Sequence, residues 1–293
     1  MEYFFKNIWP ILKKDIVEVF AFIGIICSAD ELLKLFYQPE EKYEKIIVFS
    51  ILLLGIIIII IKNIPPKKYS FLIKNKDIKI KLVIGDLLKQ NASIIVPTNS
   101  TFDTKMENDF ISLKSVQGQV QNKYFKNNLN VLDVLIQKGL KNNKNYIKLK
   151  DRKDSKKNQY EIGTTVEINY KDRRFYFLAD SNINANGQTV DPNLTNITDA
   201  LSRVWQFISE CAHVETLAIP LLGTGRMGIT NSREEILKQI IFSFVANNNT
   251  KKIAEELIIC IRKEDIKKYK INISTIVEYI DYVCKYQYDN YNI

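Results

Sequence analysis

Residues 221–230, LLGTGRMGIT, carry glycines at positions 223, 225 and 228 in the spacing G-x-G-x-x-G. A strand-like run, ETLAIPL (215–221), precedes them, and a helix is predicted to begin where Ser232 and Glu235 form a capping box. A turn of this kind presents backbone N–H groups and a helix dipole to an anion, and glycine lacks the Cβ that would keep a phosphate away. The stretch therefore predicts a phosphate-bearing ligand, with a plain tight turn as the alternative.

The position of this loop in the chain excludes the dinucleotide-binding fold of dehydrogenases. In that fold the glycine fingerprint opens the first strand–helix unit, and an acidic residue follows about 20 residues later. Here the loop lies late in the chain, and Asn248 occupies the corresponding place after Gly228. The glycine loop must therefore belong to a different fold.

Strand-like and helical patterns alternate after the first 66 residues. Several strands precede the first convincing helix, and strands and helices alternate later, which favours an α/β fold with a mixed sheet flanked by helices. A Lys/Asn-rich insertion around 141–160 is predicted to be a solvated loop, or else a surface for lipid head groups or a partner. The strand-like runs are FLIKN, IKIKLVIG, ASIIVPT, GTTVEINY, RRFYFLA, ETLAIPL and ELIICIR, and the helical patterns fall near 120–140, 195–213, 232–247, 264–270 and 273–287.

Two further motifs accompany the glycine loop. VIGDLLKQNASIIVPTNSTFD (83–103) has a Gly-Asp turn after one strand and a second strand that ends in Pro97, Thr98 and Asn99, and SVQGQV (115–120) is another glycine-containing connection. With the three motifs in this order, the chain resembles the macro domain family of ADP-ribose binders over about residues 70–270. The resemblance implies a macro-domain-like mixed sheet that binds an ADP-ribose derivative, with no cofactor and no metal ion.

The resemblance also implies roles for individual residues. Asp86 would accept a hydrogen bond from the adenine amino group, Leu87 would lie beside the adenine, and Asn99 would lie near the distal ribose. The SVQGQV connection would close one side of the site with Ser115, Gln117, Gly118 and Gln119. The glycine loop would surround the diphosphate with Leu222, Gly223, Thr224, Gly225, Arg226, Met227 and Gly228.

Two features favour binding without turnover. Hydrolytic members of the macro domain family have an asparagine three residues before the position of Asn99, where this chain has Val96. His213 is the single histidine, which leaves little for chemistry that needs a histidine base with a partner or several histidine ligands. The chain is therefore predicted to be a ligand-binding protein and not an enzyme.

The first 66 residues are predicted to form a transmembrane helical hairpin. The run IIVFSILLLGIIIIII (46–61) is continuously apolar and fits a span from about 44 to 62. A weaker span from about 15 to 37 carries Glu18, Asp30 and Glu31, and its alternative is an amphipathic helix on the membrane surface. Lysines before the first span and after the second predict that both termini are cytoplasmic. We therefore expect a multi-pass protein of the inner membrane whose cytoplasmic domain is residues 67–293.

Two membrane helices followed by a macro domain resemble the membrane-bound effectors of bacterial Thoeris anti-phage systems. The resemblance implies that a TIR-domain protein makes a signal from NAD, such as an ADP-ribosylated imidazole or amino acid. The effector would bind this signal, form a homo-oligomer and disrupt the lipid bilayer in abortive infection. A membrane-tethered ADP-ribosyl hydrolase and a passive anchored scaffold are the alternatives. Despite the net charge of +9, the lysines form no aromatic-plus-arginine stripe, so no nucleic acid is predicted as a partner.

Overall fold

The computed structural model describes two compact units, residues 1–66 and residues 67–293. In the second unit and its preceding residue 66 it describes all residues except 107–110, 127, 151, 153–155, 224–227, 249–250 and 287–293. In the first unit it otherwise describes only Gly24, Cys27, Ser28, Glu31, Ile46, Phe49, Ser50, Leu53, Leu54, Gly55 and Ile57.

These positions of the first unit are all helical. Two of their serines bond to the preceding helical turn: Ser28 Oγ donates to the carbonyl of Gly24 at 2.9 Å, and Ser50 Oγ donates to that of Ile46 at 2.8 Å. Among the described residues, no helix combines the length and the apolar character needed to cross a bilayer. The predicted spans, 15–37 and 44–62, lie for the most part outside the described residues, and the hairpin stays a prediction.

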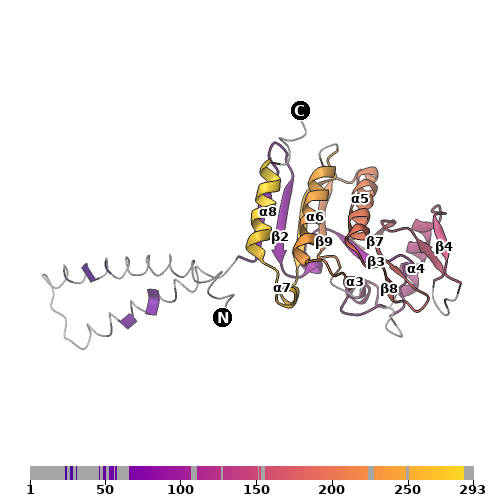
Figure 1. Cartoon of the computed structure of the whole chain (residues 1–293), viewed down its shortest axis with the longest axis horizontal. Helices are drawn as coiled ribbons and strands as arrows, with labels where there is room; N and C mark the ends of the chain where they lie inside the picture. Colours follow the sequence, from indigo (N-terminus) through magenta and orange to yellow (C-terminus); the bar gives the residue numbers. More distant parts are fainter. Residues whose placement is uncertain are drawn as a thin grey trace. The chain divides into compact units, whose positions relative to one another are not determined.

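The second unit is built on one eight-stranded sheet with the order β1-β2-β10-β9-β3-β7-β6, with β8 paired to β7 (Figure 1). The central strands β2, β10, β9, β3 and β7 are parallel, while β1 and β6 run antiparallel at the two edges. This is the mixed α/β sheet that the sequence predicts. The strands are β1 (Lys68–Leu72), β2 (Lys79–Ile84), β3 (Ser93–Asn99), β6 (Thr165–Tyr170), β7 (Arg173–Ile183), β8 (Thr189–Val190), β9 (Glu215–Pro220) and β10 (Ala254–Ile261).

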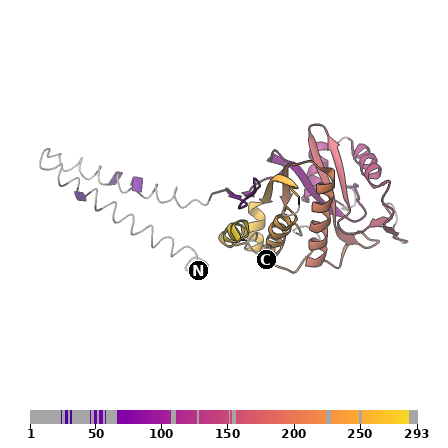
Figure 2. The same cartoon turned by 90° about the horizontal axis from the view of Figure 1, so that it is seen from above.

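Helices cover both faces of this sheet (Figure 2). The helical pattern near 120–140 is two helices, because the chain turns between Tyr124 and Leu129, and the other four helical patterns each match one helix. Their bounds are η2 (Leu87–Lys89), α3 (Val116–Tyr124), α4 (Leu129–Leu140), α5 (Leu194–Cys211), α6 (Arg233–Asn247), α7 (Lys263–Tyr269) and α8 (Ile273–Tyr286).

The insertion around 141–160 is not solely a solvated loop. It contains a two-stranded antiparallel sheet of β4 (Tyr146–Lys148) and β5 (Asn158–Tyr160), which the sequence analysis did not predict. Strand β4 is exposed along its length, but Arg152 in the connection between the strands is 1% exposed. Strand β4 is therefore solvated as predicted, whereas Arg152 anchors the same segment in the domain.

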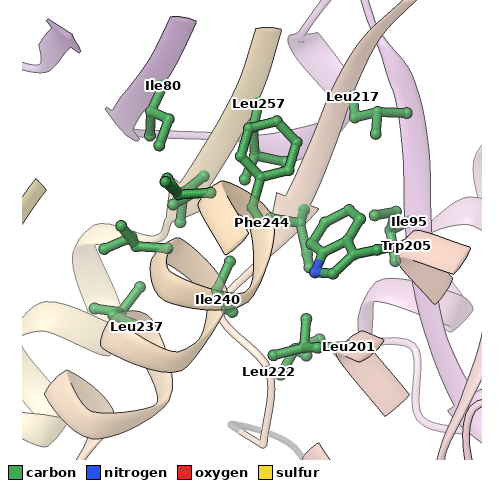
Figure 3. Packing of buried hydrophobic residues seen from close by; sticks show 14 of the residues in the cluster. Ile80, Ile95, Leu201, Trp205, Leu217, Leu222, Leu237, Ile240, Phe244 and Leu257 are labelled. Carbon is green, nitrogen blue, oxygen red and sulfur yellow. The ribbon is translucent and has the colours of Figure 1, made fainter. Parts of the chain in front are cut away.

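Alternate residues of the parallel strands point to two hydrophobic clusters, one on each face. The larger cluster lies under α5, α6 and α8, where Trp205 and Phe244 meet edge to face with ring centroids 5.4 Å apart (Figure 3). Trp205 also donates a hydrogen bond from Nε1 to Ser243 Oγ at 3.0 Å, which satisfies its buried polar atom. The smaller cluster lies under α3, α4 and η2. Burial on both faces makes the sheet a fixed frame for the loops at its ends.

Candidate functional site

The carboxyl ends of the parallel strands meet at one edge of the sheet. The loops after β2, β3 and β9 begin there, and these loops hold the three sequence motifs. Adjacent strands β3 and β9 send their following helices to opposite faces, since Val120 of α3 packs in the smaller cluster and Ile236 of α6 packs in the larger one. Such a divergence is the usual ligand position in open α/β sheets. The candidate site is therefore this edge, around β3 and β9.

Asp86 lies at the end of β2, where Gly85 N donates to the carbonyl of Ile261 at 2.9 Å and ties the turn to β10. The side chain is exposed, and its Oδ1 accepts a hydrogen bond from Leu88 N at 2.8 Å. The Asp86 carboxylate also lies near Cys260 of β10. Burial, and then the negative charge of Asp86, raise the pKa of the Cys260 thiol to about 12. One oxygen of Asp86 caps η2, and the other makes no hydrogen bond within the described part of the chain and can accept from a ligand. Leu87 is 7% exposed and packs in the smaller cluster.

The loop before α3 reaches the same edge. Arg262, just after β10, donates from Nη1 to the carbonyl of Lys114 at 3.3 Å. Ser115 caps α3, accepting from Gly118 N at 3.0 Å, and Gln119 Nε2 donates to the carbonyl of Lys114 at 3.0 Å. An added Cβ on Gly118 would lie 2.2 Å from the carbonyl oxygen of Ser112. The glycine is therefore required by close packing within the loop itself.

Gln117 is 3% exposed and is bonded within the protein at both ends of its amide. Its Oε1 accepts from Thr98 Oγ1 at 3.0 Å, and its Nε2 donates to the carbonyl of Asp103 at 2.6 Å. These bonds hold α3 against the end of β3 and the loop that follows. The buried side chain of Gln117 thus stabilises the loops of the site and does not face a ligand. Ser115 and Gln119 are half-buried and lie nearer the surface.

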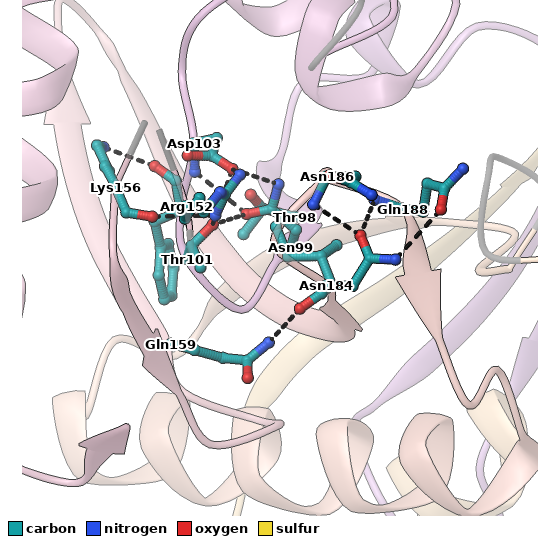
Figure 4. A network of polar contacts seen from close by, with 12 residues as sticks. Thr98, Asn99, Thr101, Asp103, Arg152, Lys156, Gln159, Asn184, Asn186 and Gln188 are labelled. Atoms are coloured by element: carbon teal, nitrogen blue, oxygen red, sulfur yellow. Dashed lines mark hydrogen bonds and ion pairs between the residues drawn. The ribbon is translucent and has the colours of Figure 1, made fainter. Parts of the chain in front are cut away.

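Asn99 is held by a buried polar network after β3 (Figure 4). Its Nδ2 donates to Asp103 Oδ2 at 3.1 Å, and its Oδ1 accepts from Thr101 Oγ1 at 3.0 Å and from Asp103 N at 3.1 Å. Arg152 from the insertion forms an ion pair with Asp103 and donates from Nη1 to Thr101 Oγ1 at 2.8 Å. The insertion therefore fixes the conformation of the loop that carries Asn99.

The glycine loop is described at its two ends. Leu222 is fully buried in the larger cluster. Gly223 and Gly228 have φ angles of 69° and 65°, the left-handed region that favours glycine. The predicted ligand residues Thr224, Gly225, Arg226 and Met227 lie outside the described residues. The predicted capping box at the start of α6 is half observed, because Ser232 Oγ accepts from Glu235 N at 3.1 Å while the Glu235 carboxylate accepts from Asn231 Nδ2 at 3.0 Å.

Sequence reasoning missed three groups at this edge. Asp180 of β7 is 5% exposed, and burial raises the pKa of its carboxyl to about 7, against the opposing effect of a hydrogen bond with Ser181. The other two are the buried Arg152 and Arg233, and arginine is the cation that proteins most readily bury beside polar groups. For Arg152 the sequence signal is weak, since it stands among lysines in a segment rich in charge. In the described part of the chain no group of three His, Cys, Asp or Glu side chains could hold a metal ion.

A parallel-centred mixed sheet with motif loops after β2, β3 and β9 defines an α/β domain of the macro type. Residues 80–262, more than half of the chain, match the family model described as Thoeris protein ThsA, Macro domain. The chain belongs to that family. A comparison with curated proteins gave no match.

Solved macrodomains share low sequence identity with the chain. A point mutant of an Oceanobacillus iheyensis macrodomain is 12% identical with a TM-score of 0.49, and the match covers 72% of this chain and 98% of that one. The same macrodomain with ADP is 12% identical with a TM-score of 0.48, covering 72% and 97%. A Trypanosoma brucei macrodomain in complex with ADP-ribose is 9% identical with a TM-score of 0.44, covering 65% and 66%.

The network after β3 generates a stability prediction. Arg152→Met should lower the free energy of unfolding by about 3–5 kcal/mol, because it leaves the buried carboxylate of Asp103 without its cation. The double variant with Asp103→Asn should recover much of this loss, since both charges are then absent. Lys150→Met, an exposed position in the same insertion, should change stability by less than about 0.5 kcal/mol. Urea denaturation of the full-length variants measures all three, and strictly additive effects of the two single substitutions would contradict the pairing.

Proposed function

We propose that this protein is a membrane-anchored sensor and effector. Its macro domain binds an ADP-ribose-containing signal derived from NAD, and the bound protein then assembles and disrupts the membrane as part of an anti-phage response. The observation that carries the proposal is the common location of Asp86 and the glycine loop at one sheet edge in a member of the ThsA macro family. An ADP-ribose moiety needs both features, an acceptor for its adenine and donors for its diphosphate.

The charges at this edge fit the two ends of such a ligand. Asp86 leaves one carboxylate oxygen for the adenine amino group, because only Oδ1 is used by the Leu88 amide. Gly223 and Gly228, at the described ends of the loop, have positive φ angles. A glycine-rich turn before a helix N-terminus commonly offers backbone N–H donors, which a diphosphate needs. Apolar side chains such as Leu87 and Leu222 support both ends from the core.

Binding without turnover is favoured over hydrolysis. Val96, at the position where the resemblance implies an asparagine in hydrolytic members, is 0% exposed and packs in the smaller cluster. Asp180 has a pKa near neutrality, as acid–base groups often do, but its side chain is buried and, by the alternation along β7, faces the larger cluster's side of the sheet. Free ADP-ribose released over many turnovers from an ADP-ribosylated protein would favour the hydrolase instead.

The membrane role is proposed from the first 66 residues. The apolar run 46–61 is suited to a bilayer, and Glu18, Asp30 and Glu31 are costly to expose to lipid, so they favour a bundle of several copies over an isolated anchor. A ligand that binds the assembled state more tightly than the dispersed state would shift the protein toward assembly. The TIR-domain enzyme that would supply this ligand belongs to the same proposal.

Asp86→Asn tests the ligand site without removing the cap of η2. The asparagine Oδ1 can still accept from Leu88 N, but its amide group then faces the adenine amino group with a second donor. ADP-ribose binding should weaken by about 10- to 100-fold, the value of a hydrogen bond to a charged acceptor. Asp77→Asn, an exposed position before β2, is the matched control and should bind as the wild type does. Titration calorimetry measures the ADP-ribose affinity of each variant. Unchanged affinity in Asp86→Asn would remove Asp86 from the site.

Dye-loaded vesicles that contain the full-length protein test the membrane role. Adding an ADP-ribosylated imidazole or amino acid should release the dye, because ligand binding favours the assembly. Asp86→Asn vesicles should stay sealed at the same ligand concentration. If wild-type vesicles also stay sealed while calorimetry shows the ligand bound, the macro domain is a sensor or scaffold that does not act on the bilayer.

A further inference from the structure

Arg233 is a buried cation without a counter-charge in the described part of the chain. It is the first residue of α6, the 15-residue helix that follows the glycine loop, and it is 7% exposed. Among the residues that the structure describes, its Nε and Nη1 find no hydrogen-bond acceptor, and it forms no ion pair with a carboxylate. A charged group buried without a partner is costly, and such groups are rare in proteins unless a ligand or ion completes them.

The guanidinium of Arg233 lies between α7 and the start of the glycine loop. One side stacks on the ring of Tyr269, with 4.5 Å from Cζ to the ring centroid. The Nη1 atom lies 3.6 Å from the position that a Cβ on Gly223 would occupy. That same position is 3.0 Å from Ile229 Cδ1 and 3.3 Å from Ile236 Cδ1. Arg233 is thus packed directly against Gly223.

Tyr269 accounts for only part of the hydrogen-bonding capacity of Arg233. Burial raises the pKa of Tyr269, but hydrogen bonds from Lys268 and then from Arg233 outweigh it, so that the pKa is lowered overall. A guanidinium has five N–H donors, and the Tyr269 hydroxyl is one acceptor. Within the described residues, no carboxylate forms an ion pair with Arg233.

The two acidic residues that follow Arg233 in the sequence accept hydrogen bonds from other groups. Glu234 Oε1 accepts from Asn272 N at 2.9 Å, and Glu235 Oε2 accepts from Asn231 Nδ2 at 3.0 Å. Helix α7 carries Glu264 and Asp265 in its first turn, and Asp265 forms an ion pair with Arg262 at 2.8 Å. The last turn of α7 carries lysines, among them Lys268, whose ammonium lies 4.8 Å from the Tyr269 ring centroid. The positive dipole end of α6 is at the same place. Arg233 is therefore the charged side chain that contacts Gly223, and no ion pair joins it to a carboxylate among the described residues.

We propose that Arg233 supplies the positive charge behind the glycine loop and so makes the loop selective for a phosphate-bearing ligand. The loop N–H groups would contact the phosphate, and Arg233 would act on it through the loop at Gly223, as a positioning residue. This inference rests on the proposed function and deepens it, because it assigns phosphate selectivity to one side chain outside the sequence motif. The contrasting role is a purely structural one, in which Arg233 only packs Tyr269 against the loop.

Two ligands with and without phosphate separate these roles. Arg233→Met should weaken binding of ADP-ribose by about tenfold or more, because the charge is lost, and should change binding of adenosine by less than about twofold. Arg233→Lys keeps the charge and should bind ADP-ribose within about fivefold of the wild type. Raising the salt concentration should weaken ADP-ribose binding to the wild type more than to Arg233→Met. Lys238→Met, which removes the cation over Tyr279 farther along α6, is the matched control and should leave both ligands unaffected.

The outcomes are distinct. If Arg233→Met weakens adenosine and ADP-ribose equally, or leaves ADP-ribose unchanged, the charge role is overturned while the proposed function stands. If the wild type does not bind ADP-ribose at all, the proposed function itself fails. Should Arg233→Met not fold by circular dichroism, the test rests on Arg233→Gln and on inorganic pyrophosphate, which should raise the melting temperature of the wild type more than that of Arg233→Gln. An equal rise in both would overturn the inference.

Discussion

The site depends on the parallel pairing of β3 with β9 in the middle of the sheet. Ser93 lies beside Leu217 and Ile94 beside Ala218, and this register brings the ends of the two strands to the same edge. Because α3 and α6 leave on opposite faces, their loops separate there and leave the edge open between them. Parallel pairing of β2 with β10 then places Asp86 at that edge. Without this register the glycine loop would be far from the other two motifs, since about a hundred residues of chain separate it from the nearer one.

The loops at this edge are held by buried polar contacts as well as by apolar packing, in which Phe102 and Leu222 are fully buried. Arg152 and Asp103 fix the loop after β3, and Gln117 ties that loop to α3. A buried ion pair is weak evidence of extra stability, but it defines one conformation, because breaking it leaves a charge unpaired in the core. The lysine-rich insertion therefore stabilises the site through its buried Arg152, whereas its strand β4 is exposed to solvent. On the other side, Arg233 stands behind the glycine loop with no such carboxylate partner among the described residues.

Local signals in the sequence predicted the parts of the fold that depend on neighbouring residues. The glycines before α6, the Ser232 cap and the strand runs were visible because each is set by a few consecutive residues. The turn that divides 120–140 into α3 and α4 was missed, because both halves follow the same helical pattern. Arg152 was missed for a different reason: its partner Asp103 is 49 residues away, and no local pattern marks a pair at that separation. Arg233 likewise follows the pattern of a solvated helix residue in the sequence, and only the fold brings it into contact with Tyr269 and Gly223.

One sheet edge, assembled from the loops after β2, β3 and β9, is proposed to bind ADP-ribose, and the sensor and effector roles both depend on that binding. Amide hydrogen exchange of the full-length protein, followed by mass spectrometry with and without ADP-ribose, tests it directly. Exchange should slow in peptides that cover 84–90, 98–104 and 221–233, and should be unchanged in β6 and in the outer part of α8. Slowed exchange confined to other segments, or no change at saturating ADP-ribose, would contradict the assignment of the site to this edge.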